Sequence, residues 1–365
     1  MKQRLCLVLM IFALIACNEQ KSSKMLDDSK RSKAQELVSV LNVRKAKGIM
    51  LGHQDALAYG SMWYGEKGRS DVKSVCGDYP AVVGWDIANV ELGEALNIDS
   101  VKFQTIVEYI QITNEMGGVS TISWTARNPV EDSAVQDPVS AILTQKKYKD
   151  KYVSYLDKLA AFFIDLKDKE GNHIPVIFRP FHNPNVETYW WNINSCTTAE
   201  YKKLWQMTVD YLRKMKKVDN LVFALSLYNP LSTEEILNCY PGDEYVDIIG
   251  SDLYLEQAND PMGKMYVENL NKTLAVITDV SDKKNKIPAL TDTGMEGIKI
   301  PNFFSELVYP VISEYPISYI LFGKNAWNIE NYYHIPIPGH PASEDFLKFV
   351  EIPRILTCNK LDNKG

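Results

Sequence analysis

The chain contains 365 residues, which is enough for one large hydrophobic core or for two domains. Its 40 Lys and Arg against 46 Asp and Glu give a formal charge of −6 at pH 7. This balance argues against nucleic acid or an anionic membrane surface as the main partner. The five His are scattered and the Cys residues are widely spaced, so we expect no metal site and no cofactor.

The N-terminus predicts a targeting segment. Lys2 and Arg4 precede an apolar run, Leu5–Ile15, that is too short to span a membrane as a mature helix. The run leads into Leu-Ile-Ala-Cys17, which resembles a bacterial lipoprotein signal, in which the cysteine is acylated. A plain secretory peptide with an incidental Cys is the alternative. The lipoprotein interpretation implies an exported protein, held at the bacterial cell envelope by lipid on Cys17, with the outer membrane as the expected site.

After this segment, short apolar runs alternate with helical patterns to the end of the chain. Most runs are near-continuous, as in strands that are buried on both faces of a parallel sheet. We predict strands over Gly48–His53, Ala81–Ile87, Val119–Thr125, Ile174–Phe181, Leu221–Leu227, Val246–Tyr254, Ile287–Thr293 and Ile317–Phe322. We predict helices over Ser32–Lys47, Ser100–Met116, Tyr152–Lys169, Thr198–Lys217, Met265–Val280, Phe303–Tyr315 and Ser343–Val350.

Eight strands that alternate with helices favour an α/β fold of the (β/α)8 TIM barrel type, in a single domain. A doubly wound open sheet is the alternative, but no GxGxxG motif follows the first strand. The expected divisions are a signal peptide over 1–16, an acylated tether over 17–33, the barrel over 34–358 and a polar tail over 359–365.

The stretch Ile174–Trp191 carries the clearest functional signal, because polar and aromatic residues follow a buried strand directly. These residues are Arg179, His182, Asn183, Glu187, Trp190 and Trp191. Charged groups can hydrogen-bond sugar hydroxyls, and indoles can stack on the C–H faces of sugar rings. The plainer interpretation is a strand end with ordinary capping groups and two half-buried tryptophans.

Polar residues also follow the other predicted strands, where a barrel places its working residues. They include His53, Asp86, Arg127, Asn128, Asp252, Tyr254, Asp292, Lys324 and Asn325, with Trp327 close behind. Each one alone is better explained as a capped or solvated group. Their shared location at one rim is what indicates a site.

With these residues in place, the sequence resembles glycoside hydrolase family 26, which contains the retaining β-mannanases and their relatives. The matching motifs, spread from about Ala34 to Leu356, are Gly52-His53-Gln54, Ser123-Trp124, Asn128-Pro129, Arg179-Pro180-Phe181-His182 and Trp190-Trp191, and Pro338-Gly339-His340-Pro341 resembles Bacteroides-type members. The resemblance implies a (β/α)8 barrel with an acid/base Glu directly after Arg-Pro-Phe-His and a nucleophile Glu in a Thr-Glu-Thr-Gly-like turn. Two such carboxyl groups lie about 5–5.5 Å apart in retaining enzymes.

The sequence departs from the family pattern at both catalytic positions and at two positions near them. Asn183 stands at the acid/base position, and Asp292 stands at the nucleophile position. Thr125 replaces a His that the family has after Ser-Trp. The run Gly323-Lys324-Asn325 replaces a Trp-Arg-Asn-like motif, so an expected subsite indole is missing.

Two functional hypotheses follow from the resemblance and the departures. The first is a lipoprotein that recognises β-mannan or a related β-glycan, with hydrolysis weakened or lost. Its expected sugar contacts are Arg179, His182, Trp190, Trp191, Tyr254, Trp124, Asn325, Trp327 and His53. The second is an active retaining endo-β-1,4-mannanase or related β-glycanase that uses Asp292 as nucleophile and Glu187 as a substitute acid/base. If the Glu187 side chain points into the cleft near Asp292, the active enzyme is favoured. If it faces solvent, recognition without efficient hydrolysis is favoured.

Overall fold

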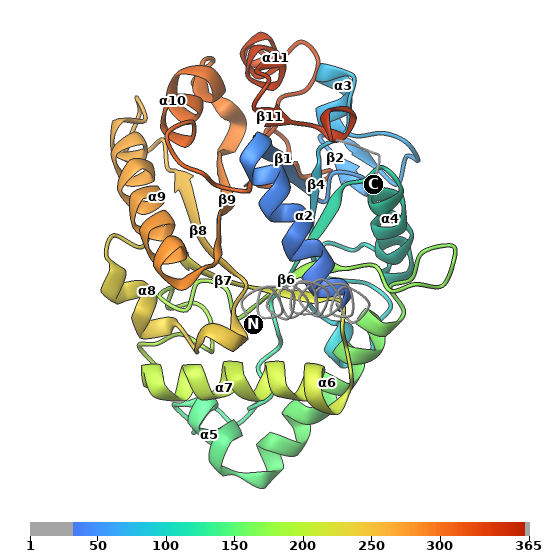
Figure 1. Ribbon diagram of the computed structural model, residues 1–365, viewed down its shortest axis with the longest axis vertical. Helices are drawn as coiled ribbons and strands as arrows, with labels where there is room; N and C mark the ends of the chain where they lie inside the picture. Colours follow the sequence, from blue (N-terminus) through green and yellow to red (C-terminus); the bar gives the residue numbers. More distant parts are fainter. Residues whose placement is uncertain (1–31, 362–365) are drawn as a thin grey trace, which may run out of the picture.

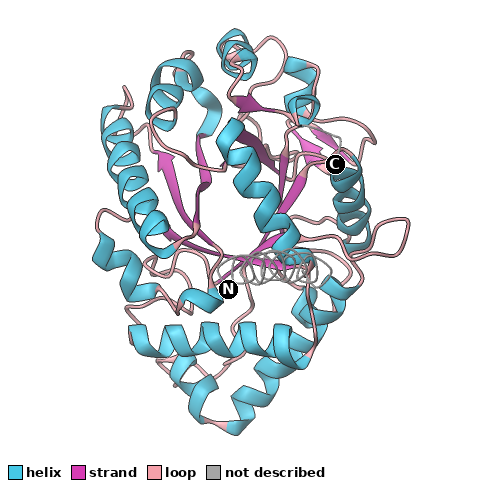
Figure 2. Ribbon diagram, viewed as in Figure 1, coloured by secondary structure: helices cyan, strands magenta, loops and turns pink. Residues whose placement is uncertain are grey.

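The computed structural model describes residues 32–361 and shows a closed barrel of parallel strands with helices around it (Figures 1 and 2). The barrel strands are β1 (Ile49–Gln54), β4 (Val82–Asp86), β5 (Val119–Trp124), β6 (Val176–Pro180), β7 (Leu221–Tyr228), β8 (Ile248–Leu255), β9 (Ile287–Met295) and β10 (Tyr319–Phe322). Each strand pairs with the next in parallel, and β10 pairs with β1 to close the ring. The prediction of a (β/α)8 barrel is confirmed, and all eight predicted strands are present.

All helices except α2 (Lys33–Lys47) follow strands of the chain and cover the outside of the barrel. The others are α3 (Asp71–Cys76), α4 (Phe103–Glu115), α5 (Pro138–Thr144), α6 (Lys146–Ile164), α7 (Thr198–Asp210), α8 (Thr233–Cys239), α9 (Lys264–Lys284), α10 (Tyr309–Ile312) and α11 (Ser343–Glu351). A π-helical turn, Tyr211–Met215, extends α7, and another, Phe303–Val308, precedes α10. A short strand β11 (Ile355–Leu356) adds to β1, and β2 (Tyr59–Gly60) pairs with β3 (Trp63–Tyr64) as a hairpin.

The prediction for one helix needs correction. The pattern predicted a helix over Tyr152–Lys169, but α6 begins at Lys146 and ends at Ile164. After α6, Asp168 accepts hydrogen bonds from the backbone N–H groups of Glu170 and Asn172 and closes a tight turn. Asp side chains favour such turns over helix interiors. The short helices α3, α5 and α8 were not predicted.

The helix α2 closes the N-terminal end of the barrel and crosses it in Figure 1. Ser32 caps the helix in a capping box with Gln35, which satisfies backbone N–H groups at its start. Leu37 and Leu41 are buried and belong to one apolar cluster with inward-facing strand residues such as Ile177. This end of the barrel is therefore sealed by apolar packing, and the opposite end is left for a site.

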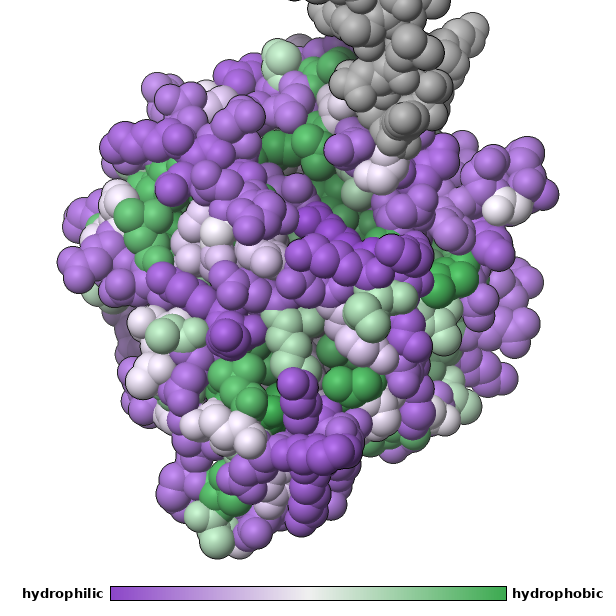
Figure 3. Space-filling view, turned by 60° about the horizontal axis from the view of Figure 1, so that its bottom comes forward, coloured by the Kyte–Doolittle hydropathy of each residue, from purple (hydrophilic) through white to green (hydrophobic). Residues whose placement is uncertain are grey.

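Three further features concern the described residues as a whole. The cysteines Cys76, Cys196, Cys239 and Cys358 all carry free thiols. Within residues 32–361, no helix has the length and apolar character needed to cross a bilayer. On the face shown in Figure 3, hydrophilic residues dominate and hydrophobic ones form separate patches. The predicted signal peptide, the lipidation site at Cys17 and most of the predicted tether lie outside the described residues.

Candidate active site

A pocket of about 650 Å³ opens at the carboxyl ends of the barrel strands. This volume is within the usual range for small-molecule sites. The pocket is lined by Gln54, Asp86, Ile98, Asp99, Ser123, Arg179, His182, Asn183, Val186, Tyr189, Tyr228, Asp252, Tyr254, Glu256, Asp292, Gly323, Lys324, Tyr332 and His334. Every barrel strand or the loop after it contributes, as expected for a TIM barrel.

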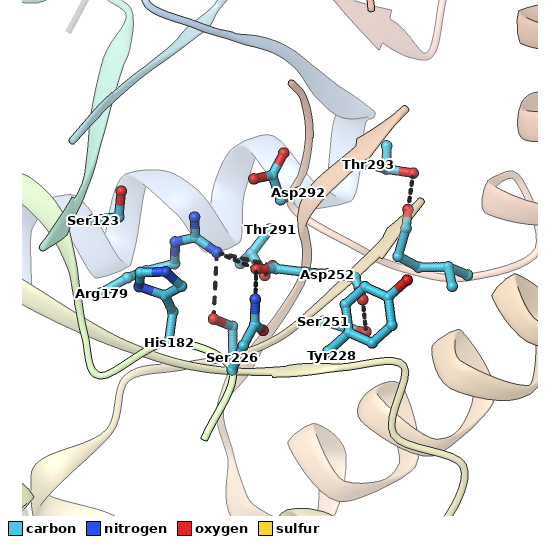
Figure 4. Close-up of polar contacts among 12 residues, drawn as sticks. Ser123, Arg179, His182, Ser226, Tyr228, Ser251, Asp252, Thr291, Asp292 and Thr293 are labelled. Carbon is cyan, nitrogen blue, oxygen red and sulfur yellow. Dashed lines mark hydrogen bonds and ion pairs between the residues drawn. The ribbon is translucent and has the colours of Figure 1, made fainter. Parts of the chain in front are cut away.

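Asp252, near the end of β8, is the centre of the polar network in the pocket (Figure 4). Arg179 Nη1 lies 2.9 Å from Asp252 Oδ1 and 3.1 Å from Oδ2. The Thr291 hydroxyl donates to Oδ1 at 2.6 Å, and the Asn183 amide donates to Oδ2 at 2.8 Å. Each oxygen of Asp252 accepts hydrogen bonds from two groups, so the carboxylate is held in one orientation. Its charge balances that of the buried Arg179 guanidinium. Burial opposes the charge of Arg179, but the carboxylates of Asp252 and Asp292 outweigh it and raise its pKa.

A β-bulge on β9 explains how neighbouring residues serve the same pocket. The register of β8 against β9 shifts between Ser251 and Asp252, so that Asp252 pairs with Asp292 and Thr291 is the extra residue. A bulge re-aims side chains that strict alternation would send to opposite faces. Thr291 can therefore donate to Asp252 while Asp292, the next residue, lines the pocket.

The Asp292 carboxyl group is held by Tyr254 and has an unusual proton affinity. The Tyr254 hydroxyl donates to Asp292 Oδ1 at 2.5 Å. Burial, followed by the nearby Asp252 carboxylate, raises the pKa of Asp292 to about 7. Near neutral pH, Asp292 is therefore present in both protonated and ionised forms.

The loop after β6 turns sharply and brings His182 and Asn183 into the pocket. Phe181 and Asn183 both adopt the left-handed backbone region, with φ of 51° at each. Asn tolerates this region better than most residues. His182 Nε2 and the Tyr189 hydroxyl lie 3.0 Å apart. Burial and then the neighbouring Arg179 lower the pKa of His182 to about 3, so the ring is neutral.

Glu187 lies outside this arrangement. Its side chain is exposed, it does not line the pocket, and its Oε1 accepts a hydrogen bond from the Asn194 amide at 3.3 Å. This solvent-facing placement argues against a role for Glu187 as substitute acid.

Three of the tryptophans expected to contact sugar are turned into the protein. Trp124 and Trp191 are at most 1% exposed, and their indole N–H groups donate to Glu91 and to the His182 carbonyl. Trp190 is half-buried and donates to the Ala126 carbonyl at 2.9 Å. None of the three lines the pocket. The expectation that these indoles offer faces to a sugar is corrected: they pack around Phe181 and support the loop that carries His182.

Asn325 and His53 are likewise buried and lie outside the pocket lining. Asn325 donates to Asp71 Oδ2 and to the Ile335 carbonyl, so it ties the loop after β10 to the fold. Both ring nitrogens of His53 are buried without a hydrogen-bond partner in the described chain, and burial lowers its pKa to about 4. Trp327 is partly exposed and packs against Tyr64 with 5.1 Å between ring centroids.

The sequence predicted Asp86 and Lys324 at the rim of the barrel, but it did not predict several of the residues that line the pocket with them. Asp86, at the end of β4, accepts hydrogen bonds from the hydroxyls of Thr125 at 2.6 Å and Ser123 at 3.1 Å. Burial raises the pKa of Asp86. Lys324 forms an ion pair with Asp99. Asp99, Tyr189, Tyr332 and His334 were missed, because they come from loops in which nothing in the sequence marks the direction of a side chain.

The balance of charge in the pocket is acidic. Its carboxyl groups are Asp86, Asp99, Asp252, Glu256 and Asp292, and its cations are Arg179 and Lys324. Among residues 32–361, no group of three or more His, Cys, Asp or Glu is arranged to hold a metal ion. What the pocket offers is a set of hydrogen-bond donors and acceptors, four tyrosine rings and one carboxyl group that titrates near neutrality.

Comparison with known proteins gives a consistent answer. The model of glycosyl hydrolase family 26 matches residues 26–309. A solved GH26 β-mannanase from Bacteroides ovatus is 39% identical, with a TM-score of 0.85 over 91% of this chain and 96% of that one. The chain belongs to glycoside hydrolase family 26. A second family 26 structure, from a Muricauda species, is 29% identical, with a TM-score of 0.80 over 90% of this chain and 91% of that one.

Two curated relatives are mannan endo-1,4-beta-mannosidases. The protein from Bifidobacterium adolescentis is 30% identical over 318 residues, which are 80% of this chain and 31% of that protein. The protein from Bacillus subtilis is 28% identical over 218 residues, which are 56% of this chain and 58% of that protein. The chain therefore spans about a third to three-fifths of the length of these two relatives.

Proposed function

We propose that this family 26 protein recognises β-mannan or a related β-linked glycan in the pocket, and hydrolyses it slowly or not at all. The observation that carries the proposal is the state of Asn183. Its side chain is an amide, and it donates to Asp252, which already accepts from Arg179 and Thr291. Neither group can give a proton to a departing glycosidic oxygen. Loss of general acid catalysis costs about 10²–10⁴-fold in rate.

The state of Asp292 supports the same conclusion. An Asp carboxyl group is one methylene shorter than the Glu that the family resemblance implies at this position. A displacement of about 1 Å in a positioned attack can cost about 10²-fold in rate. The bond from Tyr254 still fixes the carboxyl group, so Asp292 can accept or donate a hydrogen bond to a bound sugar.

Recognition has support that does not depend on catalysis. Three of the relatives named above are mannanases, and the pocket keeps hydrogen-bonding groups on several sides of one cavity. Tyr189, Tyr228, Tyr254 and Tyr332 offer flat rings with hydroxyl groups. Such amphipathic rings suit a ligand with apolar faces and polar edges. The acidic balance of charge favours neutral glycans over glycans that carry carboxylates.

A second candidate is slow hydrolysis with a different proton donor. Glu187 does not favour it, because its side chain is exposed and bonded to Asn194. Asp86 does, because this carboxyl group lines the same pocket and its pKa is raised by burial. Asp86 would then donate the proton, with Asp292 as nucleophile or base.

The experiment pairs binding with product release. Purified protein is run in affinity gels that contain mannan or galactomannan, and reducing ends are measured after long incubation. Retarded migration without product supports the proposal, and hydrolysis that appears in the double variant Asn183→Glu/Asp292→Glu supports it further. Wild-type turnover that Asp86→Asn abolishes and Glu187→Gln leaves intact would establish the second candidate. Absence of both binding and turnover would overturn the β-mannan assignment.

We also propose that Cys17 carries a lipid that holds the protein at the outer membrane, where it would meet polysaccharide beside true hydrolases. The support is the Leu-Ile-Ala-Cys17 motif after a short apolar run. Cells labelled with radioactive palmitate should incorporate label into the full chain and not into Cys17→Ala. Label in both, or in neither, would contradict the anchor.

A further inference from the structure

His334 occupies a position at the pocket that no motif in the sequence marked. It lies on the loop after β10 and packs against two glycines of neighbouring strand ends. A Cβ atom on Gly294 would lie 2.5 Å from His334 Cδ2. A Cβ atom on Gly323 would lie 2.6 Å from the Tyr254 hydroxyl and 3.0 Å from His334 Nδ1. Real Cβ contacts are not as short as 2.5 or 2.6 Å, so His334 in this position requires glycine at 294, and Tyr254 with His334 beside it requires glycine at 323.

This packing explains the indole that is missing at the end of β10. Gly323 stands where the family resemblance implies a tryptophan. With Tyr254 and His334 this close, an indole at 323 has no room. The imidazole of His334, from a residue eleven positions later in the chain, has taken the adjoining space.

The ring of His334 is firmly held. Its backbone N–H donates to Asn325 Oδ1 at 2.8 Å, and Nδ1 lies 2.9 Å from the Lys324 carbonyl oxygen. The rings of Tyr254 and Tyr332 lie against it at centroid distances of 5.3 and 5.4 Å, both nearly perpendicular. Side chains held in this way keep one orientation, which is what a binding contact requires.

The hydrogen bond to Lys324 fixes which ring nitrogen carries the proton. A carbonyl oxygen only accepts, so Nδ1 must donate, and in the neutral ring Nε2 is then an acceptor. Burial lowers the pKa of His334, which keeps the ring neutral. Nε2 makes no hydrogen bond within residues 32–361, although His334 lines the pocket. The structure therefore presents one directed acceptor without a protein partner, beside the Tyr254–Asp292 pair.

We propose that His334 determines specificity in the glycan site, because its Nε2 accepts a hydrogen bond from one hydroxyl of the sugar ring seated beside Asp292. This inference rests on the proposed function, since it assigns one contact within that site. This part of the pocket therefore has a hydrogen-bond acceptor, His334 Nε2, in place of the flat face of an indole. The sugar bound there is selected by where it carries a hydroxyl, and less by the apolar face that it can stack.

The test uses two substitutions that separate the two nitrogens. In His334→Asn, the amide can replace Nδ1 and donate to Lys324, but nothing reaches the position of Nε2. In His334→Gln, the longer amide can place its oxygen near the position of Nε2. Affinity for β-1,4-mannohexaose is measured by calorimetry with the full protein. We expect about a 3- to 10-fold weaker affinity in His334→Asn and partial recovery in His334→Gln.

Monodeoxy β-1,4-mannotrioses then identify the contact. Removal of one particular hydroxyl should weaken binding to the wild type and leave binding to His334→Asn unchanged, as in a double-mutant cycle. If both variants bind the hexaose as tightly as the wild type and no deoxy sugar shows coupling, the role of His334 is overturned while the proposed function stands. If the wild type binds no oligosaccharide of mannose, glucose or xylose in β-1,4 linkage, the proposed function fails together with this inference.

Discussion

The two ends of the barrel are built from the same eight strands but differ in how their side chains are satisfied. At the N-terminal end, Leu37 and Leu41 of α2 close the ring by apolar packing. At the C-terminal end, Arg179 Nε, His182 Nδ1 and Asn183 Oδ1 are buried without a hydrogen-bond partner in the described chain. Buried polar atoms left unpaired are costly, and they are tolerated where a ligand or water completes them. The N-terminal end is therefore closed by apolar packing, and at the C-terminal end polar atoms that line the pocket are left for a ligand or water to complete.

The largest effect is expected at the centre of the polar end. Asp252→Ala leaves the buried Arg179 without its carboxylate. Removal of one partner of a buried ion pair typically costs about 3–5 kcal/mol. We expect a loss of this size in the free energy of unfolding, measured by urea denaturation, together with loss of glycan binding.

The matched control for this variant is Asp150→Ala, which removes the exposed ion pair between Lys146 and Asp150. The free energy of unfolding should then change by less than about 1 kcal/mol. Equal losses in the two variants would show that the network around Asp252 contributes no more than a surface pair.

The apolar end should show a similar loss of stability with no functional cost. Leu41 is fully buried in the cluster that seals the barrel. Leu41→Ala should lower the free energy of unfolding by about 2–5 kcal/mol through lost burial and the cavity that remains. Affinity for manno-oligosaccharide, measured below the unfolding transition, should stay at the wild-type value. A weaker affinity would mean that the two ends are coupled and would break the comparison.

The two ends also differ in how far the sequence could predict them. The barrel strands were predicted to within two residues at each end, because strands buried on both faces appear as apolar runs. The polar residues on the strands themselves, such as Arg179, Asp252 and Asp292, were placed in the pocket correctly, since strand ends share one rim.

The loops were less predictable for a physical reason. An indole after a strand can face a ligand or the core equally well, and contacts with Phe181 and with the Ala126 and His182 carbonyls hold Trp190 and Trp191 in the protein. The His334 side chain lines the pocket, and Asn325 holds its loop by a hydrogen bond that spans nine residues. Neither arrangement leaves a periodic pattern in the sequence.

The raised pKa of Asp292 predicts a smaller effect that depends on pH. Burial and Asp252 raise this pKa from 3.8 to about 7 in the folded protein. The group therefore favours the fold most below its unfolded pKa, and that contribution is lost as the pH rises through about 7. Asp292→Asn removes the titration, so the variant should gain stability relative to the wild type between pH 5 and pH 8. One pKa unit corresponds to about 1.4 kcal/mol, so the expected gain over this pH range is at most about 3 kcal/mol, measured by urea denaturation at each pH. A difference between the two proteins that does not change with pH would contradict the assignment.

The smallest effect is expected at Trp327, which does not line the pocket. Trp327 packs against Tyr64, and the Tyr64 hydroxyl donates to the Ser100 carbonyl, next to the Asp99 that lines the pocket. A sugar unit that leaves the pocket on this side would meet both rings. Trp327→Ala should therefore weaken affinity for mannohexaose by about 3-fold and leave affinity for mannobiose unchanged, because only the longer ligand reaches the rim. Trp327→Phe, which keeps a flat ring, is the control and should retain most of the affinity. If Trp327→Ala weakens the affinity for both ligands equally, Trp327 does not contact the longer ligand directly. Its role would then be to support the loop that carries His334.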